Sequence, residues 1–177
     1  MACATRSIRA SPKGCKRMQL ALLAPVPCIH LRSALDQGVR NHQRTAFGTN
    51  ASNSFIDKDG RPIVERGWQV LIYASRPETD EIPYLFRAEH VVVTAVFCGW
   101  DWARGKSREY VGDAVRPPTT LNEATKDTGW EGYWEVAELR QIKPLVHFKN
   151  LLSLPSGKKF KKGFVPERPM LVNWIDG

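Results

Sequence analysis

Two tryptophans flank an aspartate in a polar stretch of the chain, at Trp100-Asp101-Trp102. Alternate residues of an extended segment project to the same side, so these two indole rings can form two walls of an aromatic cage. Stacking a nucleic-acid base on such a ring contributes about 1–3 kcal/mol. The alternative is that both rings cover the open end of the core. The other four tryptophans are assigned to packing: Trp68, Trp130, Trp134 and Trp174.

Five further side chains have groups that suit the edge of a base. Arg40, Asn41 and Gln43 lie together in one short segment, and side-chain amides offer a donor and an acceptor side by side. Their alternative role is to cap a loop. Tyr73 and Ser75 end a predicted strand, where the Ser75 hydroxyl can donate to a base carbonyl. With the Trp pair, these residues form the predicted base-binding set.

Basic residues gather in two clusters. The first is expected to form an exposed hairpin between two glycines, with Arg168 near it, and consists of Lys158, Lys159, Lys161 and Lys162. The second follows the tryptophan pair and consists of Arg104, Lys106 and Arg108. Positive side chains that neutralise phosphates release condensed counterions, so both clusters predict phosphate contacts. The alternative is an ordinary solvated surface.

The charge of the whole chain also favours contacts with phosphate. The 177 residues have a net charge of +8, and the sequence pI is about 9.5. Residues 1–17 contain five basic groups and no acid, whereas residues 18–139 contain 13 basic and 16 acidic groups. Residues 140–177 contain eight basic and two acidic groups, so the positive charge is concentrated at the two ends. DNA or RNA, plain or modified, is therefore the expected partner.

The sequence contains no pattern typical of a metal, cofactor or nucleophilic site. Its cysteines are scattered and lack the paired spacing of a zinc site, so we expect free thiols in a reducing cytoplasm: Cys3, Cys15, Cys28 and Cys98. It has no phosphate-binding glycine loop and no Ser or Cys nucleophile in a recognised turn. We therefore expect no metal, no cofactor and no catalytic residue.

The elements that must position these side chains are mainly short strands. Strands are predicted at Gln19–Ala24, Trp68–Tyr73, Tyr84–Phe97, Trp130–Val136, Leu139–Leu145 and Pro169–Trp174. Helices are predicted at His30–Gln37, where Gly38 is the expected C-cap, and at Val146–Leu152, with a further helical turn near Ala51–Phe55. Pro25 and Pro27 are expected to end the first strand, and Gly99–Asn122 to form a long loop. The predicted fold class is α+β: a small mixed β-barrel of five or six strands with two or three short helices.

The first seventeen residues lack apolar periodicity and are rich in Arg, Lys, Ser and Ala. We expect residues 1–17 to be a disordered basic extension and residues 18–177 to be one domain. A transit peptide has a similar composition, and Met18 is an alternative natural start. The longest apolar run, Val91–Cys98, is too short to span a bilayer.

Several of these segments resemble a known family. Gly38-Val-Arg-Asn-His-Gln43, Gly67-Trp-Gln-Val-Leu-Ile-Tyr73, Tyr133-Trp-Glu-Val136 and Ile142-Lys-Pro-Leu145 resemble segments of EVE-domain proteins, which belong to the PUA-like superfamily with the ASCH and YTH domains. Ala46–Arg66 would be an insertion, and Trp68 stands where the family has Asp. The resemblance implies a pseudobarrel with a concave site for a single, often modified, base.

Three functions follow as hypotheses. The first is a module that recognises a flipped or modified base in DNA or RNA with an aromatic pocket. The second, implied by the ASCH resemblance, is a small hydrolase of a modified nucleoside, for which Arg87 and Glu89 on one strand face and Glu135 on another are the candidates. The third is a non-catalytic protein-interaction module.

Overall fold

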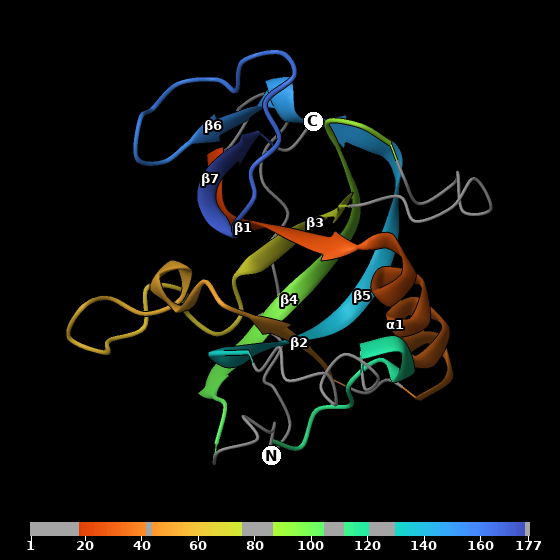
Figure 1. Ribbon diagram of the computed structural model, residues 1–177. Helices are drawn as coiled ribbons and strands as arrows, with labels where there is room; N and C mark the ends of the chain where they lie inside the picture. Colours follow the sequence, from red (N-terminus) through yellow and green to blue (C-terminus); the bar gives the residue numbers. More distant parts are fainter. Residues whose placement is uncertain (1–17, 42–43, 76–86, 105–111, 121–129, 176–177) are drawn as a thin grey trace, which may run out of the picture.

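A computed structural model describes residues 18–41, 44–75, 87–104, 112–120 and 130–175 (Figure 1). Its strands are β1 (Met18–Pro27), β2 (Thr45–Thr49), β3 (Gln69–Ser75), β4 (His90–Trp102), β5 (Gly132–His147), β6 (Leu151–Ser153) and β7 (Met170–Ile175). Its named helical elements are α1 (Cys28–Asn41) and the 3₁₀ turns η1 (Ser52–Ser54) and η2 (Phe148–Asn150), and residues 118–120 are also helical. The molecule is therefore rich in strands with few helices, as the sequence predicted.

All seven strands belong to one sheet, in the order β2-β5-β4-β3-β1-β7-β6. The sheet is open, so the predicted small β-barrel is not a closed barrel. Closure requires the first and last strands to pair with each other. Among the described strands, β2 pairs only with β5, and β6, which is three residues long, pairs only with β7. Outside the strands, Thr45 of β2 also forms an isolated bridge with Val115.

The first strand continues through the two prolines that were expected to end it. Pro25 stands opposite Tyr73 and Pro27 opposite Ser75 in a parallel pairing of β1 with β3. On its other side, β1 pairs with β7 only over Met18–Leu23. Successive backbone groups of a strand alternate in direction, so two prolines spaced by two can both turn their ring nitrogens to the unpaired edge. Strand β1 therefore ends at Pro27, beside Ser75, the last residue of β3.

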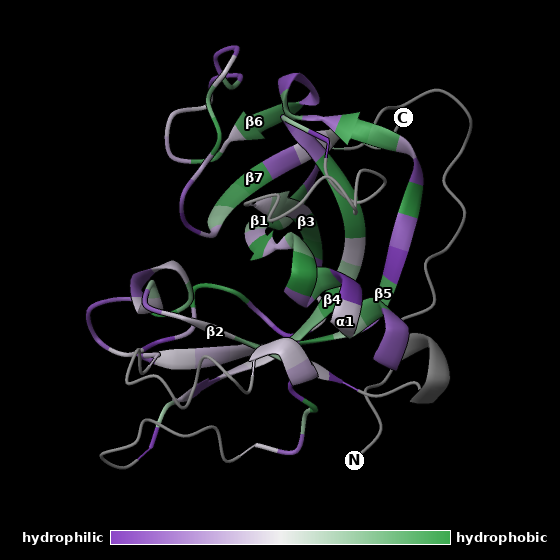
Figure 2. Ribbon diagram, turned by 45° about the vertical axis from the view of Figure 1, so that its right-hand side comes forward, coloured by the Kyte–Doolittle hydropathy of each residue, from purple (hydrophilic) through white to green (hydrophobic). Residues whose placement is uncertain are grey.

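The middle of the sheet is buried on both faces. Leu22 and Ala24 of β1 belong to a core cluster with Leu31 of α1, while Ala21 and Leu23 belong to a second cluster on the opposite face with Phe148. A strand covered on both sides has a continuous apolar sequence instead of an alternating one. Figure 2 shows apolar residues in the neighbouring strands β1, β3 and β4.

Other element boundaries also differ from prediction. Helix α1 continues through Gly38, so Gly38 is not its C-cap. β4 continues to Trp102 by pairing with β5, so Gly99–Trp102 is not part of a loop. The two strands predicted at Trp130–Val136 and Leu139–Leu145 are one strand, β5, with register irregularities opposite β4 that bend the pair without ending it.

The short elements β2 and η2 lie in segments for which a different secondary structure was predicted. β2 lies in a stretch where no strand was predicted; its five residues include Gly48 and two threonines and show no clear alternation. Of the predicted helix at Val146–Leu152, only η2 is helical, and strand residues flank it. None of the helices in the described ranges combines the length and apolar character needed to cross a bilayer.

Candidate functional site

A groove of about 960 Å³ lies where the parallel strands β1 and β3 end. Pro27 and Ser75 form one side at these strand ends, and the segment that follows β2 forms another. Val165–Pro169, which precedes β7, closes the groove on a third side. The groove is therefore assembled from segments distant in sequence, which only the completed sheet brings together. Its volume is within the range of small-ligand sites.

Trp130 is the half-buried aromatic side chain of this groove. Its indole lies directly against Gly48 of β2: a Cβ atom at Gly48 would be 2.6 Å from Nε1 of the indole and closer still to Cδ1 and Cγ. Only a glycine in β2 allows this approach. Trp134 also borders the groove, but it is 2% exposed and packs against Phe47, at 5.0 Å between ring centroids.

Polar groups line the wall beside Trp130. The Glu131 carboxylate accepts a hydrogen bond from Ser52 Oγ at 2.8 Å, and the Glu131 backbone N–H donates to Asn50 Oδ1 at 2.9 Å. These bonds join the segment after β2 to the start of β5. Asn50 and Asn53 therefore border the groove on a segment that is joined to β5, while Ser75 borders it on the side formed by the strand ends. Their amide and hydroxyl groups can hydrogen-bond the edge of a planar, polar ligand.

The segment before β7 is held by Tyr73. The Tyr73 hydroxyl donates to the Pro166 carbonyl oxygen, and its ring meets Phe148 edge to face at 5.1 Å. Burial, with a smaller contribution from the negative charge of Glu167, raises the pKa of Tyr73 above its ordinary value. Tyr73 therefore remains a neutral hydrogen-bond donor throughout the physiological pH range.

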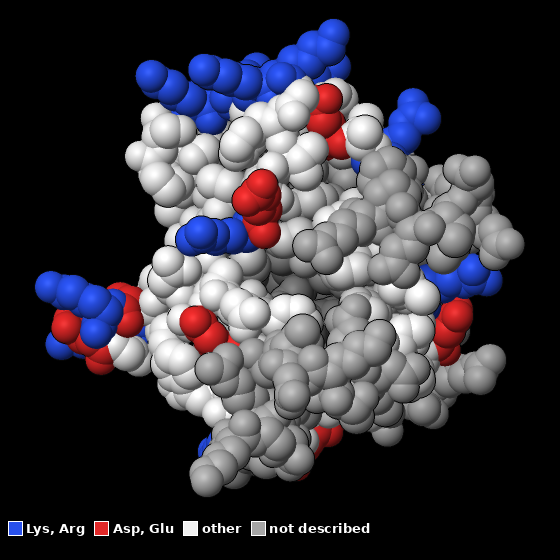
Figure 3. Space-filling model, in the orientation of Figure 1, with Lys and Arg blue, Asp and Glu red and all other residues white. Residues whose placement is uncertain are grey.

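The loop between β6 and β7 is strongly basic. Its four lysines are exposed: Lys158, Lys159, Lys161 and Lys162. The backbone bond from Ser153 N–H to Lys158 O and the positive φ angles of Gly157 and Gly163 fold it into tight turns. Figure 3 shows basic side chains gathered at the end of the molecule formed by β6 and this loop. The loop continues into Arg168, which borders the groove.

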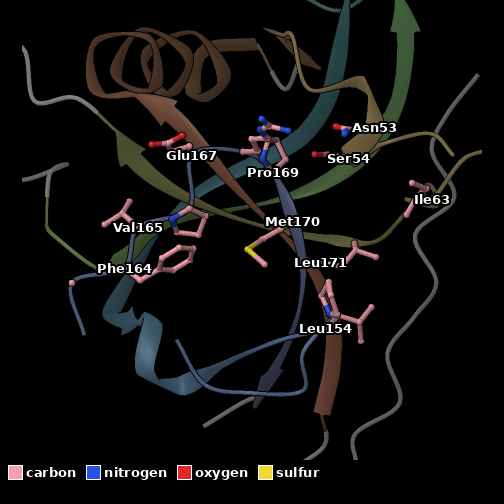
Figure 4. Close-up of a pocket in the computed structure, with 14 residues that line it drawn as sticks. Asn53, Ser54, Ile63, Leu154, Phe164, Val165, Glu167, Pro169, Met170 and Leu171 are labelled. Carbon is pink, nitrogen blue, oxygen red and sulfur yellow. The ribbon is translucent and has the colours of Figure 1, made fainter. Parts of the chain in front are cut away.

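A second groove, of about 800 Å³, adjoins the first. Asn53 and Val165–Pro169 line both grooves, so one segment of chain separates them. Figure 4 shows Phe164 and Val165 on one side of the second groove, with Asn53, Ser54 and Ile63 on the other. Its lining is mainly apolar.

The tryptophan pair of β4 lies outside both grooves. Trp100 stacks on Phe55 with 4.7 Å between centroids, and it packs against the core cluster. Trp102 is 50% exposed and meets Trp100 edge to face at 82°. One face of Trp100 is thus already covered, and the two rings do not stand as opposite walls of a cage. In the neighbouring basic cluster, Nη2 of Arg104 lies 3.8 Å from Oδ1 of Asp101. Lys106 and Arg108 of this cluster lie outside the described residues.

The other predicted residues are distributed as follows. Ser75 borders the first groove, and Tyr73 stands behind the wall that the grooves share. Arg40 and Asn41 belong to the last turn of α1, and Gln43 lies outside the described residues. Of the hydrolase candidates, Arg87 and Glu89 lie in the turn before β4, not on a strand.

Glu135, the third hydrolase candidate, is 8% exposed and accepts a hydrogen bond from Arg44 at 2.9 Å. It stands opposite Ala46 in the pairing of β2 with β5, and it does not line either groove. The structure therefore brings the three hydrolase candidates to no common site.

The sequence identified Ser75 and the basic loop, but it did not identify Trp130 and the segment after β2 as parts of a site. The available signal was the run Thr49-Asn-Ala-Ser-Asn53, which is rich in hydrogen-bonding groups.

No protein-family model matches the sequence, and no curated protein matches it.

Proposed function

We propose that this protein binds single-stranded nucleic acid and holds one unpaired base in the groove beside Trp130. The observation that carries the proposal is the composition of that groove. A half-buried indole and the polar groups of Asn50, Asn53 and Ser75 border one cavity of about 960 Å³. Base recognition needs these two parts, an aromatic face for stacking and polar groups for the edge of the base.

The basic loop supports the same function. The loop with the exposed lysines continues into Arg168, which borders the groove, so a base in the groove would bring its phosphates toward the positive charge of Arg168. A neutral small molecule would not need this loop. Phosphate attraction also accounts for the excess positive charge at the C-terminal end of the chain.

The resemblance to EVE-domain proteins, in the PUA-like superfamily, also favours base binding. Its relatives are thought to read modified bases, and the resemblance implies a concave site for a single base. The groove borders the end of the Gly67–Tyr73 segment that carries part of the resemblance. We therefore propose that the groove accepts a plain or a modified base, with selectivity set by the polar groups that border it.

The test is a titration with labelled single-stranded DNA and RNA, each plain and with one methylated adenine or cytosine. We expect binding that weakens as the salt concentration rises from about 50 to 200 mM. Trp130→Ala should weaken it by roughly 5- to 150-fold, because it removes the stacking surface.

Trp102→Ala is the matched control, because it removes an exposed indole outside both grooves. If Trp102→Ala weakens binding and Trp130→Ala does not, the base site is at the β4 pair instead. If no strand binds the wild-type protein at low salt, the proposed function is wrong.

A further inference from the structure

Phe164 is an exposed aromatic ring with one face already covered. It is 48% exposed, and it stacks on Phe160 with 5.7 Å between centroids and 9° between planes. Phe160 is in turn anchored by Phe148, at 6.1 Å, in the core cluster beneath the loop. The Phe164 ring is thus held in a fixed orientation by a rigid support. An aromatic ring held in this way is a preorganised platform for stacking a planar group.

This ring borders the second groove, of about 800 Å³ (Figure 4). The groove has an aliphatic floor that includes Met170 and Leu171, while Asn53 and Ser54 give its opposite side hydrogen-bonding groups. A purely lipid-binding surface would not need these polar groups. A nucleoside has both an apolar face and polar edges, which fits this mixture.

The two grooves are placed as neighbouring subsites. They share Asn53 and the segment Val165–Pro169, and Arg168 borders both. Lys161 and Lys162 directly precede Gly163, which lines the second groove. A phosphate that crosses the shared segment would therefore lie near a cluster of positive side chains.

We infer that the second groove is a subsite for the nucleoside next to the base held at Trp130. The ligand is then a single strand of at least two nucleotides, because two bases held in separate grooves cannot remain paired with a complementary strand. This inference rests on the proposed function. It adds Phe164 as the stacking residue of the second subsite.

The test compares mononucleotides, single-stranded octanucleotides and the matching blunt duplex, each as a DNA and an RNA set. The variants are Phe164→Ala, Phe164→Tyr, which keeps the ring, and Leu145→Ala, which removes an apolar side chain that is 37% exposed and borders neither groove. Phe164→Ala should weaken octanucleotide binding by roughly 5- to 150-fold. Mononucleotide binding should not change, and Phe164→Tyr and Leu145→Ala should bind the octanucleotide as the wild type does.

Three results would overturn the inference. One is that Phe164→Ala binds the octanucleotide as tightly as the wild type, while Trp130→Ala binds it weakly; then the proposed function stands and the second subsite does not. Another is that the duplex binds as well as the single strand. The third is that Phe164→Ala loses binding only to vesicles of phosphatidylcholine and phosphatidylserine, which would make the surface a lipid contact. If the wild type binds no nucleic acid, the proposed function itself fails. Thermal unfolding of each variant checks that the fold is retained.

Discussion

The contact between Trp130 and Gly48 joins two residues that are distant in sequence and central to the groove. Gly48 belongs to β2 and stands opposite Tyr133 in β5. Its missing side chain is the space that the indole fills. Gly48→Ala should therefore push the indole out of position, weaken oligonucleotide binding and reduce stability only slightly, because the half-buried Trp130 can swing toward solvent.

Gly132→Ala is the matched comparison. A Cβ there would lie 2.6 Å from Cη2 of Trp100 and 2.8 Å from the Asp101 carbonyl oxygen, in packing that cannot move as freely. We expect it to lower the free energy of unfolding by about 1–3 kcal/mol. Urea unfolding and oligonucleotide titration of both variants measure the two effects separately. Equal stability loss in the two variants would contradict this account of Trp130.

We expect His147 to make the free energy of unfolding depend on pH near neutrality. Its Nδ1 accepts a hydrogen bond from Lys149 N–H at 3.1 Å, and its ring lies 4.6 Å from that of His90. Partial burial, His90 and Lys149 lower the pKa of His147 below its ordinary value of 6.5, against a smaller opposing effect of Glu89. The neutral ring is therefore favoured in the folded state.

The unfolded chain then binds more protons than the folded chain below about pH 6.5, so stability falls as the pH falls through the folded pKa of His147. We expect His147→Gln to show a weaker loss of unfolding free energy between about pH 7 and 5 than the wild type does. Urea unfolding at a series of pH values measures this slope. An unchanged slope in the variant would mean that other groups set the pH dependence.

At the scale of elements, the segment before β7 has little regular structure of its own, yet it forms the wall between the two grooves. Its main anchor is the bond from Tyr73 of β3 to the Pro166 carbonyl. Tyr73→Phe removes only the hydroxyl and leaves the ring against Phe148. We expect the free energy of unfolding to fall by about 1 kcal/mol and octanucleotide binding to weaken with it. Binding that is unchanged would show that the wall holds its position without Tyr73.

The elements that could be predicted are those whose sequence pattern is local. β3 and β7 have β-branched and aromatic residues bounded by turns, and α1 has an apolar face at Leu31, Ala34 and Leu35. β2 could not be predicted because its stability comes from pairing with β5 and from contact with Trp130. The length of β1 could not be predicted either, because the tolerance for its prolines depends on which strand edge stays unpaired.

In the candidate site, too, some residues could be predicted from the sequence and others could not. Exposed lysines between two glycines are visible in the sequence, and the structure keeps them exposed. Trp130 shares its alternation with the buried Trp134, so the pattern predicts core for both. Only the position of the segment after β2 shows that one of the two rings borders a groove. A sequence pattern describes one strand at a time, so it cannot predict a site that is built from the ends of several strands.

At the scale of the whole molecule, the question is whether the net charge of +8 or its local arrangement attracts nucleic acid. The sheet places β7 beside β1 and next to the edge strand β6, so the end of the basic loop, just before β7, lines the grooves. A second basic pair, Lys58 and Arg61, lies in the hairpin turn after η1, together with Asp57 and Asp59. These two positions can be compared at equal change in total charge.

The double variant Lys161→Gln/Lys162→Gln removes two positive charges beside the grooves, and Lys58→Gln/Arg61→Gln removes two from the other turn. Each lost phosphate contact to a single strand should make the slope of log K against log salt shallower by about 0.7. We therefore expect the loop variant to change the slope by about 1.4 and the control variant to leave it nearly unchanged. Oligonucleotide titrations at several salt concentrations give both slopes. Equal changes would mean that net charge alone attracts the strand, whereas a change confined to the loop variant places the phosphates where the two grooves require them.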